Sequence, residues 1–88
     1  METEQTLKKE TRKWLLRIER EIKKLEPSGQ RGGEFLENIR AYMKDSGYFL
    51  EKGDLVRSFE CVIWAWAICE TARELDILRP VKPKGSKG

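Results

Sequence analysis

The longest apolar run in this chain is the nine-residue segment Cys61–Cys69, with the sequence CVIWAWAIC. Because a helix needs roughly 20 apolar residues to cross a bilayer, this run does not predict a membrane span. Helix-forming sequence flanks the run, and on a helix Trp64 and Trp66 point about 200° apart. A helix that is apolar on opposite sides needs a packing partner on each side. The run therefore predicts either a central helix or an interaction surface.

The size and composition of the chain are those of one small folded domain. The chain has 88 residues, of which 38% are charged and 39% are hydrophobic. These proportions are typical of a folded protein and not of a disordered one. The N-terminal sequence lacks the basic start and apolar stretch of a signal peptide, so we expect a cytoplasmic protein with no membrane association.

Apolar residues recur at helical spacing in three segments, which predicts helices over about 4–26, 34–52 and 54–78. The glycine-rich segment 27–33 is expected to be a loop. Gly53 is expected to adopt a left-handed conformation and Asp54 to cap the last helix, which makes the second and third helices an antiparallel hairpin. Gly47 falls in mid-helix, where we expect a close neighbouring helix to explain it.

These segments predict an all-α protein, an up-down-up three-helix bundle that forms a single domain over residues 1–79. The lysine-rich segment 80–88 has few side chains to bury and is expected to be a disordered basic tail.

The sequence gives little support for catalysis or metal binding. It contains no histidine, and histidine is the commonest general base and metal ligand. Cys61 and Cys69 lie eight positions apart, which is about 12 Å along a helix and too far for a disulfide. We therefore expect two small apolar side chains, no catalytic residue, no metal site and no cofactor.

Two clusters of polar residues are nevertheless candidate binding sites. The first is a candidate polar pocket at the helical hairpin, made of Asn38, Asp45, Tyr48 and Arg57. Capping and solvated helix surface explain the same residues more simply.

The second cluster is a basic face on the first helix, which is a candidate nucleic-acid surface. The cations Lys9, Arg12, Lys13, Arg20, Lys23 and Lys24 share one arc of the helical wheel with Leu16. Such a row can follow a phosphate backbone, and the basic tail would add contacts. A solvated charged face is the more ordinary interpretation, because the net charge is only +3.

The last helix carries two apolar stripes on nearly opposite sides. The stripe that we expect to face a partner comprises Cys61, Trp64, Ala65, Ile68, Ala72 and Leu75. In one interpretation both stripes pack inside the monomer. In the other, which we favour, this stripe contacts a second copy or a protein partner.

The segments around Tyr42, from Asp45 to Glu60 and from Trp64 to Ala67 resemble a small archaeal family known as "domain of unknown function 357". The resemblance covers roughly residues 35–75. It implies a short up-and-down three-helix bundle in an archaeal cytoplasm, with no assigned activity.

Together these observations favour a non-catalytic protein-interaction or self-association module, with a homodimer as one form of it. The alternative is a nucleic-acid-binding accessory protein that uses the basic face of the first helix and the tail. A ligand site in the candidate polar pocket is the third hypothesis.

Overall fold

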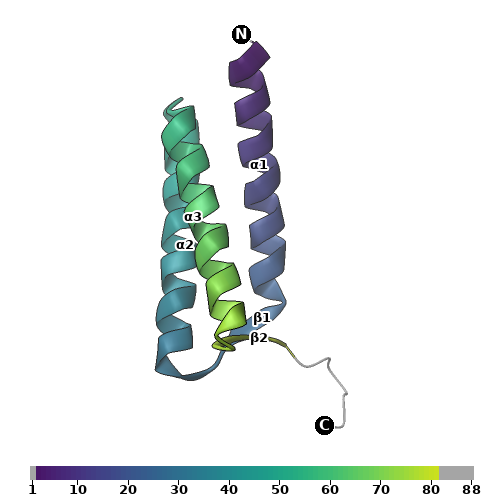
Figure 1. The fold of residues 1–88 in the computed structure, drawn as a ribbon. Helices are drawn as coiled ribbons and strands as arrows, with labels where there is room; N and C mark the ends of the chain where they lie inside the picture. The colour runs from purple at the N-terminus through teal and green to yellow at the C-terminus, as the bar shows by residue number, and fades with distance from the viewer. Residues whose placement is uncertain (1, 82–88) are drawn as a thin grey trace.

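The computed structural model describes residues 2–81 as three long helices joined at one end by a short β-ribbon. The elements in chain order are α1 (Glu2–Lys23), β1 (Leu25–Pro27), α2 (Gly29–Glu51), α3 (Leu55–Glu74) and β2 (Leu78–Pro80). Figure 1 shows α1 and α3 running in one direction and α2 running in the other. This arrangement confirms the predicted up-down-up three-helix bundle.

The turn between α2 and α3 has the predicted chemistry. Gly53 adopts a left-handed φ of 80°, which an L side chain rarely adopts. The N–H of Asp54 donates to the carbonyl of Phe49 at 2.9 Å, which completes a Schellman-type end to α2. The carboxylate of Asp54 then accepts from the N–H of Arg57 at 3.3 Å and caps α3.

A reciprocal pair of buried hydrogen bonds fastens α2 to α3. The hydroxyl of Ser46 donates to the carbonyl of Ser58 at 2.7 Å, and the hydroxyl of Ser58 donates to the carbonyl of Ser46 at 2.6 Å. Both serines are fully buried. Small side chains let the two helices approach closely, and each hydroxyl finds an acceptor on the other helix, so neither buried hydroxyl is left unsatisfied. We call this contact the serine clasp.

Helix α1 packs on the opposite side of α3, as Figure 1 shows. The indole N–H of Trp66 donates to the carbonyl of Trp14 at 3.2 Å, and the two rings meet edge to face with centroids 5.8 Å apart. This is a favourable aromatic geometry. Near the other end of the contact, Arg73 and Glu21 form an ion pair at 2.9 Å. Helix α3 is therefore the central helix.

The core runs between the three helices and extends to the β-ribbon. Its buried apolar residues come from every element of the fold: Ile18, Ile22, Leu25, Leu36, Ile39, Val62, Ala65, Cys69, Ala72 and Leu78.

The β-ribbon is the part of the fold that the sequence analysis missed. Strands β1 and β2 are antiparallel, and Leu25 faces Pro80 in the register. Helix α1 ends at Lys23 and α3 at Glu74, each before the predicted ends at 26 and 78. A left-handed Asp76, with a φ of 60°, turns the chain after α3, as the short polar side chain of Asp allows. Pro27 and Pro80 are the last residues of the two strands. At these ends the missing N–H of proline is tolerated.

The start of α2 also differs from the prediction. The segment 27–33 was expected to be a loop, but α2 begins at Gly29. Gly32 is buried, and a Cβ there would clash with the backbone carbonyl of Ile77. Tertiary packing therefore overrides the low helix propensity of these glycines. The explanation offered for Gly47 is wrong, because no atom of a neighbouring helix lies within 4 Å of a Cβ built there.

Most of the predicted basic tail, residues 82–88, lies outside the described part of the chain. Pro80, which was assigned to that tail, instead belongs to β2 and pairs with Leu25.

The two glycines give a direct test of this packing. Gly32→Ala should lower the free energy of unfolding by about 1–3 kcal/mol, because the new methyl group must displace backbone. Gly47→Ala, in the same helix, should raise it by about 0.5–1 kcal/mol through helix propensity. Urea unfolding of both variants measures the difference. Equal effects of the two substitutions would contradict the close approach at Gly32.

Because of the serine clasp, the free energy of unfolding should depend both on the size of the side chain at position 46 and on its ability to form a hydrogen bond. Ser46→Ala should lower the free energy of unfolding by about 1 kcal/mol, because one buried hydrogen bond is lost. Ser46→Val should cost more, because its extra methyl groups do not fit between the helices. Thr6→Ala is the control, since it removes an exposed hydroxyl from α1 and should change stability by less than about 0.5 kcal/mol. A Val variant as stable as the Ala variant would refute close packing at the clasp.

Candidate functional site

One side of α3 exposes large apolar side chains to solvent. Val56 is 64% exposed, Ile63 44%, Trp64 58% and Leu75 49%. Ala67 is exposed between them. We call the side formed by Val56, Ile63, Trp64, Ala67 and Leu75 the outer face of α3. Large apolar side chains gathered on one helix face are typical of a contact surface.

The outer face follows from the central position of α3. One side of the helix packs on α2 through the serine clasp, and another packs on α1 through Trp66. The nearly continuous apolar sequence of the helix supplies apolar residues to the third side as well. Helices that are apolar on all sides are normally covered on all sides. In the single chain this third side has no cover from the described residues 2–81.

The predicted interaction stripe only partly coincides with this face. Trp64 and Leu75 are exposed as expected, and Cys61 and Ile68 are half-buried. Ala65 and Ala72 are fully buried core residues, so the structure removes them from the surface. Their small side chains permit close contact between helices. This is why they lie in the core and not on the side that we expected to face a partner.

The prediction missed three residues of the outer face, namely Val56, Ile63 and Ala67. Val56 and Ile63 lie one heptad apart on α3 and Ala67 follows four positions later, a spacing that places all three on the same side of a helix. That spacing was the available signal.

Charged side chains also lie on the outer face, because Glu60 and Glu74 share its arc of the helix with Val56 and Trp64. Glu60, Glu70 and Glu74 are exposed on α3. Arg57 is held loosely, because its guanidinium lies 3.6 Å from Asp54 and its side chain is 68% exposed. On the α2 side, the ring of Tyr42 stacks on that of Trp64 with centroids 6.4 Å apart. The contact with Tyr42 orients the indole while leaving most of it accessible.

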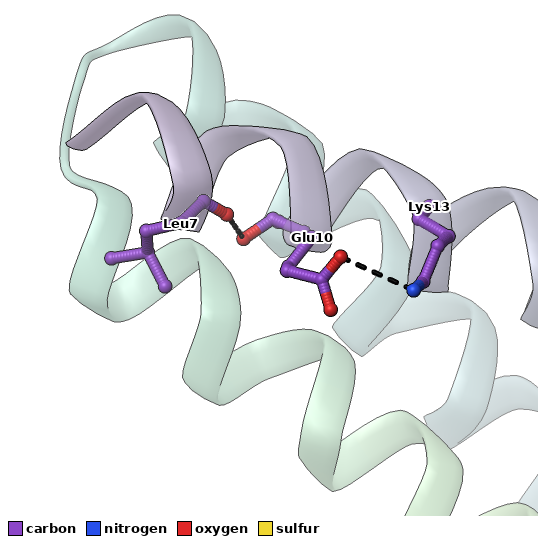
Figure 2. A network of polar contacts seen from close by, with 4 residues as sticks. Leu7, Glu10 and Lys13 are labelled. Carbon is purple, nitrogen blue, oxygen red and sulfur yellow. Dashed lines mark hydrogen bonds and ion pairs between the residues drawn. The ribbon is translucent and has the colours of Figure 1, made fainter. Parts of the chain in front are cut away.

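The candidate nucleic-acid residues are all exposed: Lys9, Arg12, Lys13, Arg20 and Lys23 on α1, and Lys24 directly after it. Arg17 joins them and lies over the ring of Trp14 at 4.7 Å. Two of these cations pair with acids at the edges of the face, Lys13 with Glu10 at 3.2 Å and Lys23 with Glu19 at 3.9 Å. Figure 2 shows the first pair, with Leu7 one turn earlier on α1.

The four residues of the candidate polar pocket do not form a joint site. Asn38, Asp45 and Tyr48 are exposed on α2, and Arg57 pairs with Asp54. Among the described residues no hydrogen bond or ion pair joins any two of the four. A cleft of about 480 Å³ occurs elsewhere, between the start of α1 and Phe59 of α3, and its lining includes Leu7 and Glu10.

Both thiols are free, and their surroundings disfavour ionisation. Burial raises the pKa of Cys61, and the carboxylates of Asp45 and Glu60 raise it further. Burial also raises the pKa of Cys69; Glu21 and Glu70 add to the effect and Arg73 opposes it. Since the thiolate is the nucleophilic and metal-binding form, neither residue is poised to react at neutral pH.

Within the described residues 2–81, no three or more metal-ligating side chains lie close enough together to hold a metal ion. No helix of this part of the chain combines the length and the apolarity required to cross a membrane.

Comparison with known proteins gives one family and one close structure. The family model described as "Protein of unknown function (DUF357)" matches residues 13–78. A crystal structure of a protein from Archaeoglobus fulgidus, assigned to the same family, is 51% identical in sequence to this chain. It superimposes with a TM-score of 0.82 over 90% of this chain and 99% of the other. No curated protein matches the chain.

The environment of the thiols predicts slow alkylation. In the folded protein the raised pKa keeps both thiols protonated where an ordinary thiol, with a pKa of about 8.5, is already ionising. The pH midpoint of the iodoacetamide reaction should therefore be higher in the folded protein than in denaturant. In denaturant it should follow the ordinary thiol. Mass spectrometry of wild type and Cys69→Ala reports the rate for Cys61 separately. A folded-state rate that levels off below the ordinary thiol pKa would contradict this assignment.

Proposed function

Because the chain belongs to the family described as Protein of unknown function (DUF357), a description that assigns no activity, we propose its function from its surface. The protein is a non-catalytic module that self-associates through the outer face of α3. The observation that carries this proposal is the apolar exposure of Val56, Ile63, Trp64 and Leu75 on the central helix. Burying such a surface is the main favourable contribution to protein association.

The occupant that best fits the outer face is a second copy of the same face. Consider two α3 helices packed antiparallel, with a two-fold axis passing between residues 65 and 66. Positions at equal distances on either side of that axis then face one another. Trp64 faces Ala67, Val56 faces Leu75, and Arg57 faces Glu74.

Each of these pairings is physically complementary. The large indole of Trp64 lies against the smallest side chain of the face, Ala67, so that a projection meets a recess. Val56 and Leu75 bury apolar surface against each other. Arg57 meets Glu74, and among the described residues Glu74 forms no ion pair within one chain. The two-fold symmetry repeats every pairing, so the benefit of each is doubled.

The arrangement also accounts for the charged residues of the outer face. In the antiparallel register Glu60 faces Thr71 and not a second carboxylate, which avoids repulsion between like charges across the interface. A parallel arrangement would place each glutamate beside its own copy. These glutamates therefore favour the antiparallel orientation.

The non-catalytic character rests on chemistry. The sequence offers no histidine as a general base, and the pKa of each thiol is raised. The exposed apolar residues of α3, by contrast, can bind a partner but carry no group that could transfer a proton.

The Arg57–Glu74 pairing gives a sharp test by charge reversal. Arg57→Glu and Glu74→Arg should each produce monomers, because each places like charges opposite one another at two symmetric positions. The double variant Arg57→Glu/Glu74→Arg should restore the dimer. Light scattering should give twice the 10.3 kDa chain mass for the wild type and the double variant. Arg40→Glu, on the exposed surface of α2, is the matched control and should remain dimeric.

A steric variant checks the register independently. Ala67→Trp would place two indoles against each other across the two-fold axis and should give a folded monomer, since Ala67 is exposed in the single chain. Ala41→Trp, on the exposed side of α2, should leave the dimer intact. A wild type that stays monomeric at high micromolar concentration would refute self-association. Failure of the double charge reversal to restore the dimer would refute the register.

A further inference from the structure

Helix α1 lies at the edge of the bundle and packs mainly on α3, as Figure 1 shows. Ile18 and Ile22 bury its inner side. Most of the exposed side chains between positions 9 and 23 are cations that share one arc of the helix, namely Lys9, Arg12, Lys13, Arg17, Arg20 and Lys23. We call these six residues the cationic arc. It extends for about 21 Å along the helix axis.

The carboxylates beside the cationic arc are already paired within the chain. Glu10 pairs with Lys13 at 3.2 Å, Glu19 with Lys23 at 3.9 Å, and Glu21 with Arg73 at 2.9 Å. Helical spacing places all three acids outside the arc. The other four cations of the arc pair with no carboxylate among the described residues 2–81. The arc therefore carries positive charge that the fold itself does not neutralise.

The cations of the arc lie on two flanks. Arg12 and Arg17 are five positions apart in the sequence, which separates their directions by about 140° around the helix axis. Lys23 lies on the flank of Arg12, and Lys13 lies on the flank of Arg17. The guanidinium of Arg17 lies 4.7 Å from the centre of the Trp14 ring, and this contact helps to hold it on its flank. Cations on both flanks of one helix suit a groove that has a phosphate wall on each side.

The middle of the arc holds an exposed leucine. Leu16 is 53% exposed, and the residues one turn before and after it, Arg12 and Arg20, are exposed cations. Exposing this side chain gives up the free energy that its burial would supply. Helical spacing places Lys9, Leu16 and Arg20 along one line between the two flanks. A matching ligand therefore has an apolar group and hydrogen-bond acceptors between two lines of negative charge.

We propose that α1 binds in the major groove of duplex DNA, with its two flanks on the phosphates of the two strands and its middle toward the base edges. This groove is about 12 Å wide and admits an α-helix, whose diameter with side chains is about 10–12 Å. Guanine presents two acceptors there, which Arg20 binds as a pair, and thymine presents the methyl group that Leu16 contacts. The flanking cations release condensed counterions from the phosphates. The arc shares no residue with the outer face of α3, so this site is independent of self-association.

Duplex DNA fits the arc better than duplex RNA or a lipid membrane does. The major groove of A-form RNA is too narrow for side chains to read. Helices that bind membranes insert an apolar side between the headgroups, but the apolar side of α1, with Ile18 and Ile22, is buried in the core. Leu16 by itself offers too little apolar surface to insert.

The placement of α1 is tested by fluorescence anisotropy with duplexes of about 20 base pairs and one sequence, prepared as DNA and as RNA. Four flanking cations on phosphates predict a slope of log Kobs against log salt of about −3.6 for DNA. Affinity for RNA should be at least about tenfold lower, because the helix does not enter the A-form groove. Equal affinity for the two duplexes would overturn the major-groove placement, and a flat salt response would overturn the phosphate contacts. Binding to phosphatidylglycerol vesicles but not to DNA would overturn both.

Matched variants separate the two flanks from general electrostatics. Arg12→Gln/Arg17→Gln removes one cation from each flank and should make the slope for DNA shallower by about 1.8. Arg40→Gln/Lys44→Gln removes the same number of charges from the exposed side of α2 and should leave affinity and slope nearly unchanged. Equal losses in both variants would overturn the assignment to α1.

The middle of the arc is tested by sequence preference. Selection from a pool of random DNA duplexes should enrich a motif with guanine at a fixed position, which binds at least about fivefold more tightly than its shuffled version. Arg20→Gln should abolish the preference for that guanine and leave the salt slope nearly unchanged, because Arg20 contacts a base. Leu16→Ala should weaken binding to the motif but not to the same DNA with uracil in place of thymine. No enrichment by the wild type, or an unchanged preference in Arg20→Gln, would overturn contact with the bases, and equal losses on thymine and uracil DNA would overturn the role of Leu16.

Discussion

The reciprocal hydrogen bonds between Ser46 and Ser58 set the distance at which α2 and α3 pack. Each hydroxyl donates to the carbonyl of the other serine, at 2.7 and 2.6 Å, inside a fully buried contact. Larger side chains would hold the helices apart, and apolar ones would leave the contact without its interhelical bonds. Because the two helices meet through small residues, the bulky side chains of α3 must project elsewhere. The serine clasp thereby determines which sides of α3 remain for α1 and for a partner.

The two tryptophans of the apolar run show the consequence. Trp66 turns toward α1, where its N–H bonds to the carbonyl of Trp14 and its ring meets the ring of that residue. Trp64 turns away, stacks on Tyr42 and remains 58% exposed. Trp66 thus holds α1 against α3, and Trp64 belongs to the outer face that we propose as a self-association surface. Their opposite roles follow from the helical angle between them and from the positions of α1 and α2 around α3.

The β-ribbon has a comparable effect on the charged surface. By pairing Leu25 with Pro80 it closes the base of the bundle and brings Val81 to the carbonyl of Lys24. Lys24, at the end of the cationic side of α1, and Val81, separated by more than fifty residues in the sequence, thus become neighbours. Gly32 is part of the same region, because its lack of a side chain lets α2 pass the carbonyl of Ile77.

The amino-acid sequence by itself determined the helical class, the order and direction of the helices, and the Gly53–Asp54 turn. These features depend on local signals, namely apolar periodicity, helix propensity and capping, which act within a few residues. The tertiary structure alone decided the β-ribbon, the helical start at Gly29 and the burial of Ala65 and Ala72, which the sequence analysis had placed on a surface. Those features depend on contacts between distant segments. A periodic pattern fixes which residues share a helix face, but the neighbouring helices decide whether that face is buried or exposed.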